Sequence, residues 1–267
     1  DAWVKAIDRI VRYGSKKPTE YGSEMIELSV VNWVAEEEPD EPFIPEDWPK
    51  ELKSVIGLES EEHVHAYVKS VFIESKLPQG STYTYGQRLR AYPITEDKQI
   101  DQIRYVIDKL KESLNTRQAI AVTWNPEIDR DIGHKSSPPC INLIQALQSN
   151  GILHFFVTVR SHDMFKAALL NAFGLRALQK EIAKELDLKL GKLSITSNSA
   201  HIYEEDWNNA RKLVQCAIWE RPPNMKWGDD VEDPRCIVLV RVENKKLVAE
   251  IMTREGELIT KIEEDTS

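Results

Sequence analysis

Apolar residues recur at helical spacing in several parts of the chain. In residues 3–13, Ile7 and Ile10 fall on one face of a predicted helix. Residues 163–187 carry the longest apolar-rich pattern of this kind, and it is broad enough for a central helix. The same period predicts further helices in residues 60–74, 99–113 and 206–219.

Short segments rich in β-branched and aromatic residues predict strands. Residues 24–34 are rich in Val, Ile and Trp, and residues 236–263 combine apolar alternation with turn-forming residues, which predicts a small β-meander. Residues 35–50 are acidic and carry four prolines, which predicts a loop or an extended segment. Further strands are predicted in residues 117–124, 153–159 and 192–204.

Helices and strands both contribute along the chain, so the predicted class is α/β or α+β, with a mixed sheet packed by helices. A chain of 267 residues forms one large domain, or one domain with a small appendage. The acidic stretch 229–233, followed by Pro234, marks a candidate boundary. We therefore predict one domain over residues 1–228 and a β-rich extension over residues 229–267.

Charge and cysteine usage exclude several classes of partner. The net charge is −9, and an acidic surface repels polyanions, so no nucleic-acid polymer is expected as a partner. The spacing of Cys140, Cys216 and Cys236 fits neither a zinc site nor a disulfide framework, which predicts a reducing, cytoplasmic location. No apolar run reaches the roughly 18–20 residues that a membrane span needs, so no membrane partner is expected.

The histidines do not indicate a metal site. His63, His65 and His134 have no acidic partner at ligand spacing, so we predict no bound metal. The Ser-His-Asp sequence at 161–163 is not a hydrolase triad, because sequence neighbours cannot adopt that geometry in a strand-to-helix turn.

Several short motifs follow one another around one cysteine. Cys140 ends the sequence PPC, and the motif R-S-x-D follows at 160–163. Asn171 comes eleven residues after the arginine of that motif, and H-x-Y at 201–203 begins thirty residues after Asn171. Upstream motif residues are Tyr85, in the sequence YGQR, and Arg117.

In order and spacing these motifs resemble the core of the thymidylate synthase family. The resemblance runs from about residue 83 to residue 207, and five motifs in order are specific evidence for homology. It implies the family's fold, with residues 1–228 as the catalytic domain. It also implies an activity at C5 of a pyrimidine nucleotide. The chain is most similar to divergent archaeal members, and related enzymes include pyrimidine nucleotide hydroxymethylases.

The chemistry at C5 explains why a cysteine is needed. C5 of a pyrimidine is a poor nucleophile, and attack of a thiolate at C6 turns it into an enolate-like carbon. Cys140 is therefore the predicted nucleophile, with an inert buried cysteine as the alternative. The amide of Asn171 can donate to uracil O4 and accept from N3–H, with a satisfied core asparagine as the alternative. By resemblance, Tyr85 positions the ring and its proton transfers.

The resemblance assigns the phosphate to Arg160, Ser161 and Arg117. Arg160 can donate two parallel hydrogen bonds to a phosphate, and Ser161 adds a hydroxyl donor. The alternative is a surface arginine at a strand end, with Ser161 or Asp163 capping the next helix. Arg117 resembles an arginine that the family sends across its dimer interface, which predicts a homodimer with shared sites.

The remaining nucleotide contacts come from two strand-end segments. By resemblance, Asp163 contacts the pyrimidine ring through its backbone. His201 and Tyr203 alternate on a predicted strand, so both side chains share a face. In the family this pair holds the sugar hydroxyl.

The folate side of the site departs from the family pattern. Ala167 stands where the family has glycine, and Leu169-Leu170 replace Pro-Phe before the asparagine. The predicted carbon donor is therefore either 5,10-methylene-tetrahydrofolate or a modified tetrahydropterin.

Three functions follow as hypotheses. The first is methylation of dUMP to dTMP through covalent attack of Cys140 at C6. The second is a hydroxymethylase acting on dCMP or dUMP, which needs the same cysteine and donor but ends with water instead of hydride. The third is a nucleotide-binding homologue without catalysis.

Overall fold

The computed structural model describes residues 2–36, 44, 48–95, 97–130, 138–218, 237–243, 246–252 and 258–265. The chain divides into two compact units, Asp1–Trp219 and Glu220–Ser267. The predicted boundary at residue 229 lies outside the described residues and stays a prediction.

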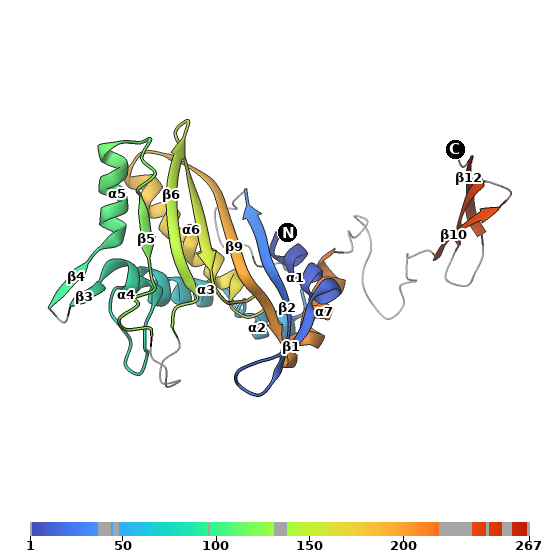
Figure 1. The fold of residues 1–267 in the computed structure, drawn as a ribbon, viewed down its shortest axis with the longest axis horizontal. Coiled ribbons are helices and arrows are strands. Elements are labelled where there is room, and N and C mark those ends of the chain that lie inside the picture. The colour runs from blue at the N-terminus through green and yellow to red at the C-terminus, as the bar shows by residue number, and fades with distance from the viewer. Residues whose placement is uncertain are drawn as a thin grey trace. The chain divides into compact units, whose positions relative to one another are not determined.

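The first unit is built on a mixed sheet of seven strands in the order β1-β2-β9-β7-β6-β5, with β8 beside β9 (Figure 1). Neighbouring strands are antiparallel, except that β9 runs parallel to both β7 and β8. The predicted mixed sheet is therefore confirmed. The strands are β1 Ser15–Pro18, β2 Glu24–Ala35, β5 Ile120–Val122, β6 Ile141–Ser149, β7 Ile152–Val159, β8 His162–Asp163 and β9 Lys189–Tyr203.

Helices cover the buried face of this sheet. Along β7 the alternating residues Leu153, Phe155 and Val157 are buried in the core, as the period of a strand requires. The central helix α6 runs behind the strands in Figure 1 and packs against β7 and β9. The helices are α1 Ala2–Tyr13, α2 Lys50–Val55, α3 Glu61–Val68, α4 Tyr85–Arg90, α5 Gln102–Glu112, α6 Ala168–Glu185 and α7 Trp207–Ile218, with single turns η1 Lys69–Ile73 and η2 Glu204–Asp206 and a small hairpin of β3 Tyr92–Thr95 and β4 Lys98–Ile100. No helix among these described residues is both long and apolar enough to cross a membrane.

A close helix contact fixes α3 and η1 against α6. Phe72, in η1, lies over Gly174 of α6, where an added Cβ atom would meet the phenyl ring at 2.1 Å. The same ring stacks on Tyr85 with centroids 4.8 Å apart. A residue without a side chain at position 174 therefore lets these two segments approach closely.

The buried face of β2 changes side at a kink. Val30 has a left-handed φ of 58°, which is unusual for a β-branched residue, and the ladder with β9 skips it. Along β2 the buried residues are even-numbered before the kink, as at Ile26, and odd-numbered after it, as at Trp33. Along β9 the buried set changes in the same way between Ile195 and Ile202. After the kink His201 is therefore on the side of β9 opposite to Ile202.

A buried ion pair supports the start of β6. Arg88 donates to both carboxylate oxygens of Asp129, at 2.7 and 3.0 Å, and the two side chains are 4% and 3% exposed. Arg88 also donates to the carbonyl of Thr123, whose hydroxyl in turn donates to the carbonyl of Ile141. The pair thereby connects α4 to the residue that follows Cys140.

Several predicted element bounds needed correction. The segment 141–149 carries no assignment from its pattern, yet it forms the strand β6. Helix α6 begins at Ala168, five residues later than predicted, because Asp163 accepts hydrogen bonds from the backbone of the next turn. Part of the predicted loop 35–50 lies outside the described residues.

The second unit is the predicted β-meander, which is confirmed. Three antiparallel strands pair in the order β10-β11-β12. Arg241 of β10 holds Glu250 of β11 through two hydrogen bonds of 2.6 and 2.7 Å, and Val248 beneath them is buried. The strands are β10 Ile237–Glu243, β11 Lys246–Met252 and β12 Leu258–Asp265.

Candidate active site

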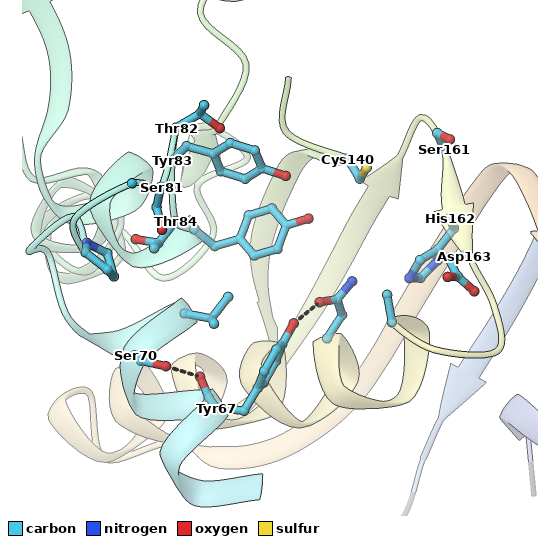
Figure 2. Close-up of a pocket in the computed structure, with 16 residues that line it drawn as sticks. Tyr67, Ser70, Ser81, Thr82, Tyr83, Thr84, Cys140, Ser161, His162 and Asp163 are labelled. Carbon is cyan, nitrogen blue, oxygen red and sulfur yellow. Dashed lines mark hydrogen bonds between the residues drawn. The ribbon is translucent and has the colours of Figure 1, made fainter. Parts of the chain in front are cut away.

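A pocket of about 570 Å³ opens beside the start of β6, and Cys140 lines it (Figure 2). The carbonyl of Cys140 accepts a hydrogen bond of 2.9 Å from the backbone of Arg160, which ties the cysteine to the end of β7. The volume falls within the range of about 300–1,000 Å³ that is typical of small-molecule sites. Five of the predicted site residues line it: Tyr85, Cys140, Ser161, Asp163 and Asn171.

Arg160 holds the backbone that precedes the cysteine. Its guanidinium donates to the carbonyls of Pro138 and Pro139, at 2.8 and 3.0 Å, and lies 5.6 Å from the ring centre of Trp124. These bonds use two of the five N–H donors of an arginine and leave three. Arg160 is not among the residues that line the pocket. Arg160 therefore serves both as a support for Cys140 and as a local positive charge.

The surroundings of Cys140 favour the thiol over the thiolate. Burial raises the pKa of Cys140, the positive charge of Arg160 acts in the opposite direction, and the negative charge of Asp163 raises the pKa further. Burial is the largest of these effects. An ionised cysteine, which the chemistry needs, therefore depends on the proton being removed when a ligand binds.

This raised pKa predicts a steep pH dependence of cysteine reactivity. The thiolate is the nucleophile, and below the pKa its fraction rises about tenfold for each pH unit. In a variant without Cys216 and Cys236, alkylation of Cys140 by iodoacetamide should keep accelerating from pH 7 to pH 9. A rate that reaches its plateau below pH 8 would contradict the raised pKa.

Two tyrosines form the wall opposite the cysteine. Figure 2 shows the ring of Tyr83 pointing across the pocket toward Cys140. Tyr85 begins α4 behind the cap of Thr84, and its hydroxyl accepts a hydrogen bond of 3.4 Å from the backbone of Ile141. Burial raises the pKa of both phenols, so each keeps its proton at neutral pH and can donate it in a hydrogen bond.

Asn171 projects into the same pocket from the first turn of α6. Its side chain is 3% exposed, and its Oδ1 atom accepts a hydrogen bond of 2.9 Å from the hydroxyl of Tyr67 on α3. The cost of burying an amide is therefore partly offset by a partner.

Ser161 and Asp163 lie between β7 and α6, where Asp163 ends the short strand β8. The Oδ1 atom of Asp163 accepts hydrogen bonds of 3.0 Å from the backbone of Phe165 and of Lys166, so this side chain caps the turn. Ser161 lines the pocket beside it. Asp163 therefore caps the turn that precedes α6 and not the helix itself, whose N-cap residue is Ala167 without a side-chain hydrogen bond.

His201 and Tyr203 lie beside the pocket and do not line it. Their rings are 4.9 Å apart in an edge-to-face contact, and His201 is the cross-strand neighbour of Asp163. Burial lowers the pKa of His201, which the charge of Asp163 partly opposes. The imidazole is therefore neutral near pH 7 and can both donate and accept hydrogen bonds.

Arg117 is separated from the cysteine in its own chain. It precedes β5, is exposed, and its carbonyl accepts a hydrogen bond of 2.9 Å from Gln145. In the pairing of β5 with β6, Ile120 lies opposite Gln145, whereas the backbone of Thr123 donates to the carbonyl of Asn142, close to Cys140. Arg117 therefore lies at the end of this strand pair that is farther from Cys140.

His162 is a buried imidazole that lines the pocket. Its Nδ1 atom is 2.8 Å from the hydroxyl of Ser197, and its Nε2 atom has no hydrogen-bond partner among the described residues. Burial lowers the pKa of His162 to about 3, so the ring is neutral. In the described part of the chain no three His, Cys, Asp or Glu side chains are placed to share a metal ion; His134 lies outside that part.

Two tyrosines that line the pocket were missed from the sequence. The helical pattern of residues 60–74 places Tyr67 in an apolar stripe, yet its hydroxyl reaches Asn171. Tyr83 lies two residues before Tyr85, and the alternation of Thr and Tyr at 82–85 was the signal that could have identified it.

The fold and the pocket define a mixed α/β protein in which a cysteine, three tyrosines and a buried amide line one pocket. The sequence profile described as thymidylate synthase matches residues 63–248. The chain belongs to the thymidylate synthase family, whose enzymes transfer a one-carbon unit to a nucleotide and use a methylene-tetrahydrofolate-type cofactor.

Archaeal relatives resemble the chain over most of their length. A protein of Methanosarcina acetivorans with the printed name "Putative thymidylate synthase" is 34% identical over 217 residues, which cover 80% of this chain and 91% of the relative. A protein of the same name from Methanocaldococcus jannaschii is 34% identical over 215 residues, covering 79% and 90%. The expected resemblance to archaeal members is thereby confirmed.

Proposed function

We propose that this protein methylates dUMP to dTMP, with 5,10-methylene-tetrahydrofolate or a modified tetrahydropterin as carbon donor. The observation that carries the proposal is that Cys140 and the amide of Asn171 line one pocket. A nucleophile for C6 and a reader of the base edge are thus available to the same ring. Membership of the family supports the reaction class.

The nucleophile and the base reader have complementary roles. Cys140 attacks C6 and forms a carbon–sulfur bond, which leaves C5 enolate-like. The charge of Arg160 favours the thiolate, and a neutral Tyr85 beside Ile141 can hold a proton close to the ring. Asn171 donates to O4 and accepts from N3–H.

The phosphate and sugar lie along the strand ends in this proposal. The unused donors of Arg160 and the hydroxyl of Ser161 bind phosphate, and the backbone of Asp163 contacts the ring. The adjacent side chains of His201 and Tyr203 hold the sugar hydroxyl.

The remaining pocket suits a tetrahydropterin. Tyr67 and Tyr83, together with Val71 and Pro78, give it a wall of aromatic and apolar surface, on which a flat ring can stack. When bound, a methylene-tetrahydropterin supplies the one-carbon unit and, in methylation, the hydride. No glutamate is among the described residues that line the pocket, and the tyrosine hydroxyls are the proton carriers in this proposal.

The product distinguishes this reaction from hydroxymethylation. With dUMP and methylene-tetrahydrofolate, mass spectrometry should find a nucleotide heavier by CH2. A gain of CH2O would establish a hydroxymethylase, and dCMP as the preferred substrate would overturn the choice of base. Binding of dUMP without turnover with folate or another tetrahydropterin would leave a nucleotide-binding protein.

We propose that the working form is a homodimer in which Arg117 reaches the phosphate of the neighbouring site. On the less buried face of the sheet, Phe156 is 42% exposed and pairs with Gln145 and Ser194 across the strands. A sheet face of this kind can pack against a second copy. Arg117 lies at the rim of β5 and far from its own Cys140, which supports a role in the partner's site.

Mixed dimers test this sharing. Cys140→Ala and Arg117→Ala variants should each lose activity alone. Unfolded together and refolded in equal amounts, they should regain about a quarter of wild-type activity, because half of the dimers then contain one intact site of two. If Arg117 acted on the site of its own chain, the refolded mixture would recover no activity. An Arg211→Ala variant, altered on the exposed surface of α7, is the matched control and should retain activity alone.

A further inference from the structure

The hydrogen bond between Tyr67 and Asn171 joins two helices across the pocket. The phenol of Tyr67, on α3, donates to Oδ1 of Asn171, on α6, at 2.9 Å (Figure 2). Both side chains line the pocket. Because an amide carries its oxygen and its nitrogen on opposite prongs, holding Oδ1 also decides where Nδ2 points.

The tyrosine permits only one orientation of this amide. Burial raises the pKa of Tyr67, so the phenol keeps its proton and needs an acceptor. Within the described residues its recorded acceptor is Oδ1 of Asn171. Rotating the amide by half a turn would place the NH2 group against the hydroxyl, and the buried phenol proton would lose its acceptor.

The surroundings of Asn171 keep this contact rigid. Phe72, five residues after Tyr67, packs on Gly174, three residues after Asn171, so the two helices cannot shift apart without losing that contact. The amide therefore presents Nδ2 to the ligand as a donor, while the second lone pair of Oδ1 can still accept.

A fixed amide distinguishes the two common pyrimidines. Uracil has an acceptor at O4 and a donor at N3–H, and both match. Cytosine has an amino donor at C4 and an acceptor at N3. The donor Nδ2 of Asn171 would then face a donor, and the acceptor Oδ1 would face an acceptor. An amide that could rotate would match either base, as a free asparagine does.

We propose that Tyr67 is a positioning residue that makes the site selective for uracil over cytosine, by fixing the side-chain amide of Asn171. This inference rests on the proposed function, since it concerns the base that the same site binds. It adds a residue outside the motifs that identify the family in this chain.

The test compares the affinities of dUMP and dCMP in the wild-type protein and in Tyr67→Phe. Titration calorimetry of the wild type should show clear preference for dUMP. Removing the hydroxyl frees the amide to rotate, so the ratio of the two dissociation constants should fall about tenfold. Tyr92→Phe, which removes another tyrosine hydrogen bond, to the carbonyl of Trp124 outside the pocket, should leave the ratio unchanged.

A second background separates positioning from a structural role. In Asn171→Asp both prongs are oxygens, so rotation changes nothing, and Tyr67→Phe added to that variant should not alter the ratio. A purely structural tyrosine would weaken both ligands equally in both backgrounds, and this result would overturn the inference. A wild type that prefers dUMP with an unchanged ratio in Tyr67→Phe would refute the inference alone. A wild type that binds neither nucleotide would overturn the proposed function together with it.

Discussion

Replacement of Cys140 by alanine should lower the rate of one-carbon transfer to dUMP by about 10⁴-fold or more, because no other thiol lies among the described residues that line the pocket. Tyr83 and Tyr85, on the opposite wall of the pocket, are neutral phenols, because burial raises their pKa values. Neither can therefore replace the thiolate as the nucleophile. Affinity for dUMP should change much less, since the amide of Asn171 and the guanidinium of Arg160 are retained.

The matched control is Cys216→Ala, which removes a cysteine from α7, outside the pocket. Its turnover should equal that of the wild type. Product formation and dUMP binding are measured on the same preparations by chromatography and by calorimetry. Turnover of Cys140→Ala within tenfold of the wild type would show that the reaction does not proceed through this thiol.

The second large effect is on stability, from Asp129→Ala. This change leaves the guanidinium of Arg88 buried without its carboxylate, which should lower the free energy of unfolding by about 3–5 kcal/mol. Because Arg88 also bonds to Thr123, and Thr123 to Ile141, the start of β6 beside Cys140 should loosen as well.

Urea unfolding followed by fluorescence measures this change. The control is Asp108→Ala, which removes an exposed partner of Arg104 on α5 and should change stability little. If both variants unfolded at the same urea concentration, the buried pair would not be the support that we describe. Activity of Asp129→Ala, measured where it is still folded, should also fall.

Much of the pocket could be predicted from the motifs. Cys140, Ser161 and Asn171 are separated along the chain, and the resemblance of their motifs to the family core predicted that they belong to one site. Cys140 directly precedes β6, Ser161 follows β7 and Asn171 lies in the first turn of α6, so neighbouring ends of these elements bring the three residues together. The central helix and the strand β9 were likewise evident from their hydrophobic periods.

Other features depend on contacts that no local pattern contains. Tyr67 looks like a core position of α3, and only the packing of Phe72 on Gly174 brings its hydroxyl to Asn171. Strand β6 carries both polar and apolar residues on its less buried face, so its alternation is weak. The kink at Val30 could not be predicted, since the left-handed backbone conformation is unfavourable for a valine.

The raised pKa of Cys140 could not be foreseen either. Sequence reasoning requires a thiolate, whereas burial favours the thiol in the unliganded protein. The two are reconciled if the nucleophile ionises only in the presence of a nucleotide. Cysteine reactivity toward iodoacetamide would then be altered by dUMP at constant pH.

The central claim is that Cys140 attacks C6 of dUMP, and release of tritium from 5-tritiated dUMP tests it most directly. Exchange at C5 needs the covalent attack, and it can be followed with and without methylene-tetrahydrofolate, beside a Cys140→Ala control. We predict release that depends on Cys140 and increases with the folate. No release in either condition, from a protein that still binds dUMP, would contradict the proposed reaction.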